Sequence, residues 1–234
     1  MCLPPLLPEP PLISRDVPGF EVTGWNRPAR QVGGDYYDVW RLANGHWGLV
    51  VADVTGKGMP AALLVSTLHS SLRLLLDHLE IGPAMVARLN RHICESSAVN
   101  KFITMILMSL DAGTAELTFL NAGHNPGLVV RAGGRVEELT SKGLPLGLLA
   151  DGGFQAESLH LESGDLVCLY SDGITECESP TEEQFGLERL SALLCADAGA
   201  PLPQLMAQID RAVSEFAAGQ PQGDDQTVVL LRRA

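Results

Sequence analysis

Apolar residues along this chain follow two spacings, one typical of β-strands and one typical of α-helices. Each spacing is confined to its own segments of the sequence. Runs that alternate with period two, or stay apolar over about four to eight residues, are typical of β-strands. From residue 20 onward such runs predict strands in "FEVTGWN", "YYDVWRLANGHWGLVVADV", "KFITMILMSLD", "AELTFLNAG", "PGLVVRA", "RVEELT", "DLVCLYSDG" and "QTVVLLRR". Asn44-Gly45 separates two apolar runs and predicts a hairpin, because both residues tolerate positive φ.

Four segments between the strand blocks are predicted to be helices, over about 59–79, 83–96, 186–195 and 202–217. The first repeats apolar residues at steps of three and four, which place them on one face of a helix. These residues are Ala61, Leu64, Leu68, Leu72, Leu75 and Leu79. Strands in blocks around paired helices indicate an α+β fold rather than the strand–helix alternation of a parallel sheet.

The first 19 residues contain six prolines. Proline fixes φ and removes a backbone donor, so we expect an extended lead-in rather than a part of the core. We therefore divide the chain into a proline-rich linker, residues 1–19, and one domain, residues 20–234. A linker of this kind suggests a sensory or coiled-coil region upstream.

Composition narrows the class of protein. The chain has 234 residues, 46% of them hydrophobic, which is enough for one large core. Its 28 acidic against 16 basic residues give a formal charge of −12, which disfavours a nucleic-acid partner because phosphate backbones are bound by clustered Lys and Arg. The five cysteines lack C-x-x-C spacing and predict reduced thiols in a cytoplasmic protein. We expect neither a membrane segment nor a signal peptide, since no apolar run approaches the roughly 20 residues of a membrane helix.

One loop, "VADVTGKGMPAAL", resembles a phosphate-binding loop at first sight. The P-loop pattern requires a glycine five positions before Gly56, where this chain has Val51, and Ser or Thr after Lys57, where it has Gly58. Asp53 would also repel a phosphate unless a cation lay between them. The loop therefore predicts a site that needs an acid and a cation.

Acidic residues occur beside glycine at several other predicted strand ends and turns. Strand ends at one edge of a sheet can converge in space, and converging carboxylates either bind cations or hold protons. Oxygen ligands favour hard cations such as Mg²⁺ or Mn²⁺. Two such ions can activate a bridging water and hold a phosphoryl group. The acids concerned are Asp35, Asp38, Asp53, Asp172, Asp224 and Asp225.

Each of these features has a simpler explanation beside the functional one. Any one of the acids alone is more often a turn or cap residue, and Asp224-Asp225 before a strand can merely discourage edge pairing. Lys57 alone is more often a solvated charge. His124 in "NAGHNP" is more often a loop-ordering residue than a catalytic base, because no nucleophile pairs with it.

Seven motifs in order carry a family resemblance: "RPARQVGGDYYD", "VADVTGKGMPAAL", "FITMILMSLD", "LNAGHNP", "GLPLGL", "LYSDGITE" and "GDDQTVVLL". Together they closely resemble the PPM family of metal-dependent serine/threonine phosphatases, in its bacterial SpoIIE-like branch. The likeness extends from about Leu12 to Arg232. It implies an α-β-β-α sandwich, in which two antiparallel sheets pack together between helices and a site for two metal ions lies at one edge.

The resemblance implies a role for each matching acid. Asp53 would bridge two Mn²⁺ or Mg²⁺ ions, and Val54 would supply a backbone carbonyl. Asp172 and Asp224 would complete the shell of one metal. The catalytic set would then be Asp38, Asp53, Asp172 and Asp224 around a metal-activated water.

Other positions match the family less directly. Asp38 would be a metal ligand or would orient metal-bound water, with Asp35 close by. Gly56 and Gly58 match the glycines that keep the family loop open. Asp225 is disfavoured as a ligand, because the match selects the first acid of the pair.

The chain also departs from the eukaryotic type-2C pattern. Thr55 stands where that pattern has a histidine, two residues after the bridging aspartate. The phosphate-binding arginine of the pattern has no counterpart, and Arg30 and Lys57 are the nearest basic candidates. The general acid is therefore unassigned, and metal-bound water is one source of the proton.

The resemblance implies a phosphorylated regulatory protein as the partner. Members of this branch act on phosphoserine or phosphothreonine in small STAS-type antagonists that control anti-sigma factors. Two other readings stay open. In the first alternative, the chain is a non-catalytic binding module that keeps the fold. In the second, it is a latent enzyme that needs an upstream segment to order its metal loops.

Overall fold

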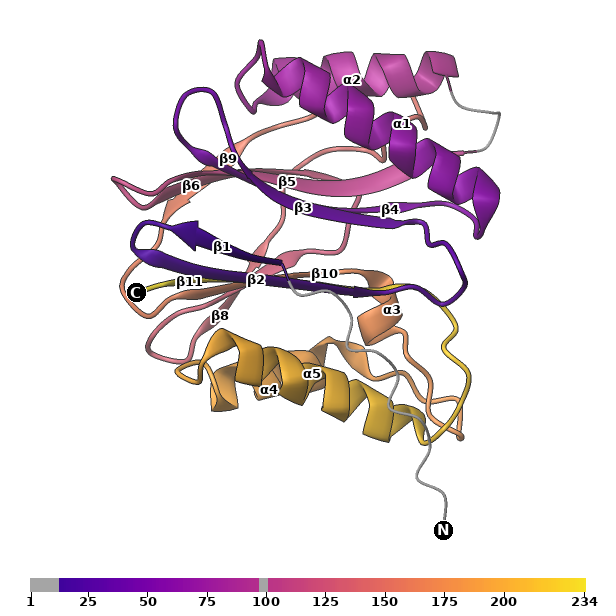
Figure 1. Cartoon of the computed structure of the whole chain (residues 1–234), viewed down its shortest axis with the longest axis vertical. Helices are drawn as coiled ribbons and strands as arrows, with labels where there is room; N and C mark the ends of the chain where they lie inside the picture. The colour runs from indigo at the N-terminus through magenta and orange to yellow at the C-terminus, as the bar shows by residue number, and fades with distance from the viewer. Residues whose placement is uncertain (1–12, 97–100) are drawn as a thin grey trace.

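The computed structural model describes residues 13–96 and 101–234. Four layers follow one another in Figure 1: a helix pair, two stacked sheets and a second helix pair. All strand pairings between named strands are antiparallel. The expected α-β-β-α sandwich is therefore confirmed.

One sheet has six strands in the order β1-β2-β11-β10-β7-β8, and the other has five in the order β3-β4-β5-β6-β9. The first consists of β1 (Ile13–Val17), β2 (Phe20–Arg27), β7 (Gly127–Val130), β8 (Val136–Leu139), β10 (Leu166–Tyr170) and β11 (Gln226–Arg233). The second consists of β3 (Asp35–Arg41), β4 (Trp47–Val54), β5 (Ile103–Asp111), β6 (Glu116–Ala122) and β9 (Glu157–His160). The chain crosses between the sheets several times, so residues far apart in sequence share each edge.

The layer between the sheets is apolar. Val51 and Met108 of the five-stranded sheet belong to the same buried cluster as Leu169 and Val229 of the six-stranded sheet. Burial of such side chains is the main force that holds two sheets face to face. The alternation of strand residues fixes which side chains enter this layer, and it thereby fixes which acids face it at the sheet ends.

Helices cover the outer faces of both sheets. On the five-stranded sheet lie α1 (Met59–Leu76) and α2 (Pro83–Ser96), whose Leu68 and Leu89 join the outer core. On the other sheet lie α4 (Gly186–Ala196) and α5 (Leu202–Ala217), while the short α3 (Asp172–Thr175) follows β10. The four long helices that the sequence predicts are all found.

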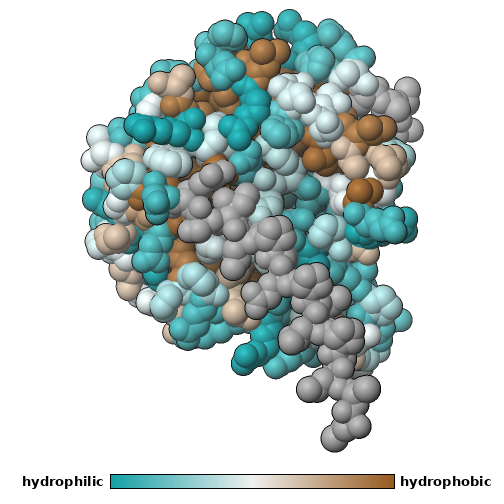
Figure 2. Space-filling view, viewed as in Figure 1, coloured by the Kyte–Doolittle hydropathy of each residue, from teal (hydrophilic) through white to brown (hydrophobic). Residues whose placement is uncertain are grey.

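Helix α1 is unusually apolar on its outer side as well. By length and composition alone it is the one described helix that would be able to cross a membrane, but Leu64, Leu68 and Leu72 pack in the core, as in a core helix of a folded domain. Met59 and Leu63 are exposed, and Figure 2 shows hydrophobic surface over this region. Elsewhere the same view shows a mostly hydrophilic surface.

The sheet begins earlier than the proposed linker boundary. β1 pairs with β2 in register from Ile13↔Gly24 to Val17↔Phe20, and Val17 is buried. The hairpin "ISRDVPGF" thus adds an edge strand inside the segment that we expected to be a lead-in. Residues 1–12, which hold most of the prolines, lie outside the described residues.

Candidate metal and phosphate site

The predicted acids meet where the two sheets end at the same edge. Asp35 opens β3 and is the cross-strand partner of Asp53, which lies near the end of β4. Both side chains face the other sheet, since Asp53 shares a strand face with Val51 of the interlayer core. From the other sheet come Asp172, directly after β10, and Asp224, just before β11.

The acids of this edge raise one another's pKa. Burial, then the charges of Asp172 and Asp224, raise the pKa of Asp53 to about 7. Burial and the neighbouring Asp53 hold the pKa of Asp35 well above its usual value, despite a hydrogen bond from Thr227. Burial and the charge of Glu176, followed by Asp224, raise the pKa of Asp172. Without a cation the cluster therefore favours protonation over accumulated negative charge.

Neighbouring side chains fix Asp35 and the second acid of the 224–225 pair. The Thr227 hydroxyl donates to Asp35 Oδ2 across the two sheets at 2.5 Å. Asp225 is buried and accepts the backbone N–H groups of Ala29 at 2.7 Å and Gly34 at 2.5 Å. Asp225 thus anchors the loop before β3, which leaves Asp224 as the half-exposed acid that faces the site.

Glycine makes room for the oxygen atoms of the site. A Cβ on Gly34 would lie 2.9 Å from the Val54 carbonyl oxygen and 3.3 Å from Asp53 Oδ1. A side chain at this position would therefore fill the space around both oxygen atoms. Gly56 has φ +96°, and Lys101 donates from its ammonium to the Thr55 carbonyl at 2.9 Å. The loop 53–58 is thereby held open beside the carboxylates.

Hard oxygen donors, partial desolvation and unbalanced negative charge are the properties that divalent Mg²⁺ or Mn²⁺ requires of a site. The residues present therefore fit such ions. Within residues 13–96 and 101–234, however, no three Asp, Glu, His or Cys side chains already form a group that would enclose an ion. Lys57 pairs with Asp224 at 2.9 Å, so an ion that used Asp224 would compete with this ammonium.

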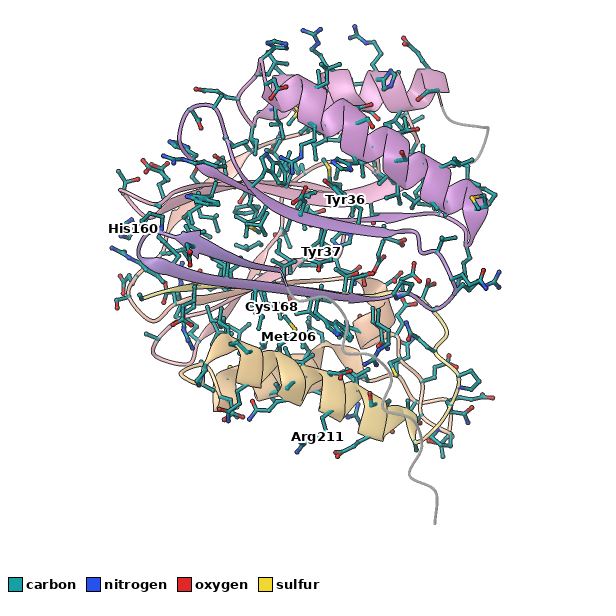
Figure 3. All side chains as sticks on the ribbon, viewed as in Figure 1. Tyr36, Tyr37, His160, Cys168, Met206 and Arg211 are labelled. Atoms are coloured by element: carbon teal, nitrogen blue, oxygen red, sulfur yellow. The ribbon has the colours of Figure 1, made fainter. Side chains whose placement is uncertain are left out.

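Asp38 does not join the other acids. In a strand, side chains three positions apart point to opposite faces, and Figure 3 shows Tyr36 on the α1 side of β3 and Tyr37 between the sheets. Asp38 follows the face of Tyr36: its Oδ2 accepts from Arg73 of α1 at 2.7 Å and from the Tyr36 hydroxyl at 3.2 Å. The structure therefore places Asp38, which we expected to be a ligand, on the opposite strand face from the other acids, and it places Asp35 beside Asp53.

His124 links the two sheets instead of facing the acids. Its Nε2 donates to the Tyr170 carbonyl at 3.1 Å, so Nδ1 is left to accept from the Thr104 hydroxyl at 2.8 Å. Burial lowers the pKa of His124 to about 4, despite the Tyr170 hydrogen bond. The imidazole is therefore neutral at physiological pH, which supports the loop-ordering interpretation of "NAGHNP".

Several residues of the site were not singled out from the sequence. Thr227 holds Asp35, and Ser171 joins the ends of β10 and β11 by donating from its hydroxyl to the Asp225 carbonyl at 3.2 Å. Lys101 supports the loop after Asp53. Ser171 directly precedes Asp172 and Thr227 lies two positions after Asp225, which is the only local signal; Lys101 carries none. Arg30, one of the basic candidates, is exposed in the loop before β3.

Comparison with known proteins decides the family. The family profile described as "Stage II sporulation protein E (SpoIIE)" matches residues 43–234. The chain belongs to the SpoIIE family. Among curated relatives, this SpoIIE-family chain is 33% identical over 210 residues to the phosphoserine phosphatase RsbU of Bacillus subtilis, covering 88% of this chain and 61% of RsbU. It is 26% identical over 250 residues to the protein IcfG of Synechocystis, covering 95% of this chain and 39% of IcfG.

Solved structures agree with the SpoIIE-family fold. The RsbU and RsbW domains of a Mycobacterium tuberculosis protein match with a TM-score of 0.78 at 27% identity, over 93% of this chain and 60% of that one. The SiaA-PP2C domain of Pseudomonas aeruginosa matches with a TM-score of 0.81 at 23% identity, over 90% and 85%. The second likeness shows the fold alone. The chain spans 39% and 61% of IcfG and RsbU, so it corresponds to one part of those proteins.

Proposed function

We propose that this SpoIIE-family domain is a metal-dependent phosphoprotein phosphatase that hydrolyses phosphoserine or phosphothreonine. One observation carries the proposal: Asp35 and Asp53 of one sheet meet Asp172 and Asp224 of the other, and burial together with the charges of Asp172 and Asp224 raises the pKa of Asp53 to about 7. Such a cluster gains stability from a bound cation. The relative RsbU is named a phosphoserine phosphatase, which supports the same reaction here.

The proposed ligands are Asp53, the Val54 carbonyl, Asp172 and Asp224, with Asp35 in place of Asp38. Two Mg²⁺ or Mn²⁺ ions, when bound, would supply an acidified water and neutralise charge on the phosphoryl group. The protein itself supplies the orientation: Thr227 fixes the Asp35 carboxylate, and Asp225 fixes the loop from which Asp35 begins. His124 is not assigned as the general acid, because it is buried and neutral.

The proposed substrate is a phosphorylated regulatory protein of the STAS-type antagonist class, acted on in the cytoplasm. The phosphatase domain is proposed to run from β1 to the end of β11, with the region before it acting as a linker to an upstream sensory part. Support comes from the relatives, which are longer than this chain.

The test is hydrolysis of an aryl phosphate and of a phosphoserine peptide by the purified chain with Mn²⁺ or Mg²⁺. We expect turnover that is abolished by a chelator and reduced at least about 100-fold in Asp53→Asn, the scale of losing a key electrostatic group. No turnover with either ion, or an unchanged rate in Asp53→Asn, would remove the proposal.

One contact favours a second candidate, a binding module without catalysis. Lys57 already balances Asp224, and it also donates to the Gly223 carbonyl at 2.5 Å. An internal ammonium would be sufficient if the domain only docked a regulator. Calorimetry with Mn²⁺ separates the candidates: the phosphatase binds the ion with loss of the Lys57 contact, whereas the binding module shows no heat of binding.

A further inference from the structure

A cavity of about 650 Å³ opens beside the acidic edge. It lies between the turn after α3, the last turns of α5 and the segment that leads into β11, on the α3 side of the lower half of Figure 1. Gly173 and Asp224 line it, and they adjoin or belong to the proposed metal site. The cavity therefore lies next to any substrate held at that site.

The cavity carries uncompensated negative charge. Glu176, Glu178 and Glu182 line it, and none of them forms an ion pair with any described residue. Arg27 is the basic residue of the lining, but its charge is already engaged: it pairs with Asp210 at 2.6 Å and stacks on the Trp25 ring. The three glutamates therefore face the cavity without a cation.

A buried amide in the cavity wall also lacks a partner. Gln226 is 5% exposed, and its Nε2 donates to the Gly173 carbonyl at 3.3 Å. That bond fixes the amide orientation and leaves Oε1 as an acceptor without any hydrogen bond. The oxygen is closed to solvent, but its side chain belongs to the cavity lining. A buried acceptor without a donor costs about 1–3 kcal/mol, so a ligand donor that reached this oxygen by a small shift of the lining would be stabilised.

The loop that carries two of the glutamates is held by backbone hydrogen bonds and has one residue in the left-handed conformation. Glu178 pairs with Gln184 in an isolated bridge, and Ser179 exchanges backbone hydrogen bonds with Glu182 and Glu183 at 2.9 Å each. Glu182 has φ +63°, a conformation that glycine or asparagine adopts at lower cost. This turn places Glu178 and Glu182 at the cavity from a hydrogen-bonded backbone.

We propose that this cavity binds an arginine side chain of the phosphoprotein substrate, near the phosphorylated residue. The proposal rests on the proposed phosphatase function. Arginine matches the wall because its planar guanidinium has five N–H donors, enough for carboxylates and for the Gln226 oxygen together. A basic neighbour would also attract a phosphorylated segment to a protein whose formal charge is −12.

The test uses phosphoserine peptides of about ten residues in which one arginine is moved along the sequence, each compared with the same peptide carrying glutamine there. At the position that reaches the cavity, we expect KM to be about five- to tenfold lower for arginine, the scale of a few charge-assisted contacts, with kcat unchanged. In Glu178→Gln/Glu182→Gln the ratio of the two KM values should fall to about one to two, as expected when those contacts are lost.

The matched control is Glu116→Gln/Glu157→Gln, which removes the same charge from exposed positions on β6 and β9. It should keep the arginine preference. Gln226→Met should weaken the preference, with its melting temperature as the check on folding; if it does not fold, the exposed Glu178 and Glu182 pair decides. An arginine preference that is absent at every position, survives in Glu178→Gln/Glu182→Gln, or is lost equally in the control overturns the proposal.

A separate measurement distinguishes failure of this inference from failure of the phosphatase function. Aryl phosphate needs no cavity contact, so its hydrolysis tests the phosphatase function alone. If it is not hydrolysed, fluorescence anisotropy of the same labelled peptides on the intact chain still reports the arginine preference as a ratio of Kd values. A Kd ratio near one would then overturn the arginine site independently.

Discussion

Two aspartates three positions apart in β3 have opposite surroundings. Asp35 faces Asp53 and Thr227 between the sheets, whereas Asp38 faces Arg73 and Tyr36 beneath α1. Their chemistry is identical, so the face of the strand alone decides that one can bind an ion and the other holds a helix. Substitution of Asp35 should therefore affect ion binding, whereas substitution of Asp38 should affect stability.

We expect Asp35→Asn to weaken Mn²⁺ affinity about 10- to 100-fold, as loss of a group that ligates or orients at a metal site does. Asp38→Asn should leave Mn²⁺ affinity within about twofold but lower the free energy of unfolding by about 1–3 kcal/mol, because Arg73 loses its charged partner and the amide has one acceptor oxygen fewer for Tyr36. Calorimetry and urea unfolding measure the two quantities. Equal losses of Mn²⁺ affinity in both variants would contradict the assignment.

Gly173 is required for contact rather than for flexibility. A Cβ at this position would lie 2.0 Å from the Asp225 carbonyl oxygen. We expect Gly173→Ala to lower the free energy of unfolding by about 1–3 kcal/mol or more, because the chain segment around Asp225 must move to accept the methyl group. Urea unfolding measures the effect. Gly199→Ala, where nothing lies within 4 Å of the added Cβ, is the control and should remain within about 0.5 kcal/mol.

Sequence reasoning identified most of the acids but not the face that each occupies. Asp53, Asp172 and Asp224 lie at strand ends that the apolar runs mark clearly, and these ends meet at one edge. In "DYYDVW" both strand faces carry a tyrosine, so alternation does not tell inside from outside, and the family resemblance favoured Asp38 over Asp35. Lys101 was missed because its contact spans 46 positions in sequence and depends on the tertiary fold.

At the scale of elements, His124 fastens β5 to the end of β10. Thr104 lies on β5 directly opposite Asp53, and Tyr170 is the last residue of β10, so the imidazole spans both sheets near the acids. Its neutrality has a measurable consequence. The unfolded chain takes up a proton at His124 below about pH 6.5, whereas the folded chain does so only near pH 4.

The contribution of neutral His124 to the free energy of unfolding should therefore fall as the pH is lowered. Because the unfolded state binds more protons in this range, the stability advantage of wild type over His124→Gln should shrink by about 1.4 kcal/mol for each pH unit between about pH 6.5 and 4. Urea unfolding at several pH values measures it. An advantage that is constant, or grows, as the pH falls would show that His124 is not buried in the neutral form.

The long helices were predictable because each repeats apolar residues over several turns. Predicted 83–96 and 202–217 coincide with α2 and α5, and α1 ends at Leu76, three residues before the predicted end. β9, with sequence "ESLH", was missed because it is a short, mostly exposed edge strand without an apolar pattern. β1 was missed because the prolines around it favoured a lead-in.

At the scale of the whole molecule, a bound ion should stabilise the sandwich. An ion present at about 100 times its Kd stabilises the folded state by about 2.7 kcal/mol. For a domain of this size that corresponds to a rise in Tm of about 5–10 °C. Calorimetric melts with Mn²⁺, before and after chelation, measure it. Asp53→Asn should show no such rise, and a Tm of the wild type that ignores Mn²⁺ would contradict the proposed site.

The carboxylates are divided between the two sheets. The distances within the cluster, and with them its affinity for an ion, therefore depend on how the sheets are positioned relative to each other. Asp35 and Asp53 move with β3 and β4, while Asp172 and Asp224 move with β10 and β11. A small slip in the apolar layer around Met108 would separate the two halves of the cluster without touching either. Repacking that layer would therefore tune ion affinity from a distance.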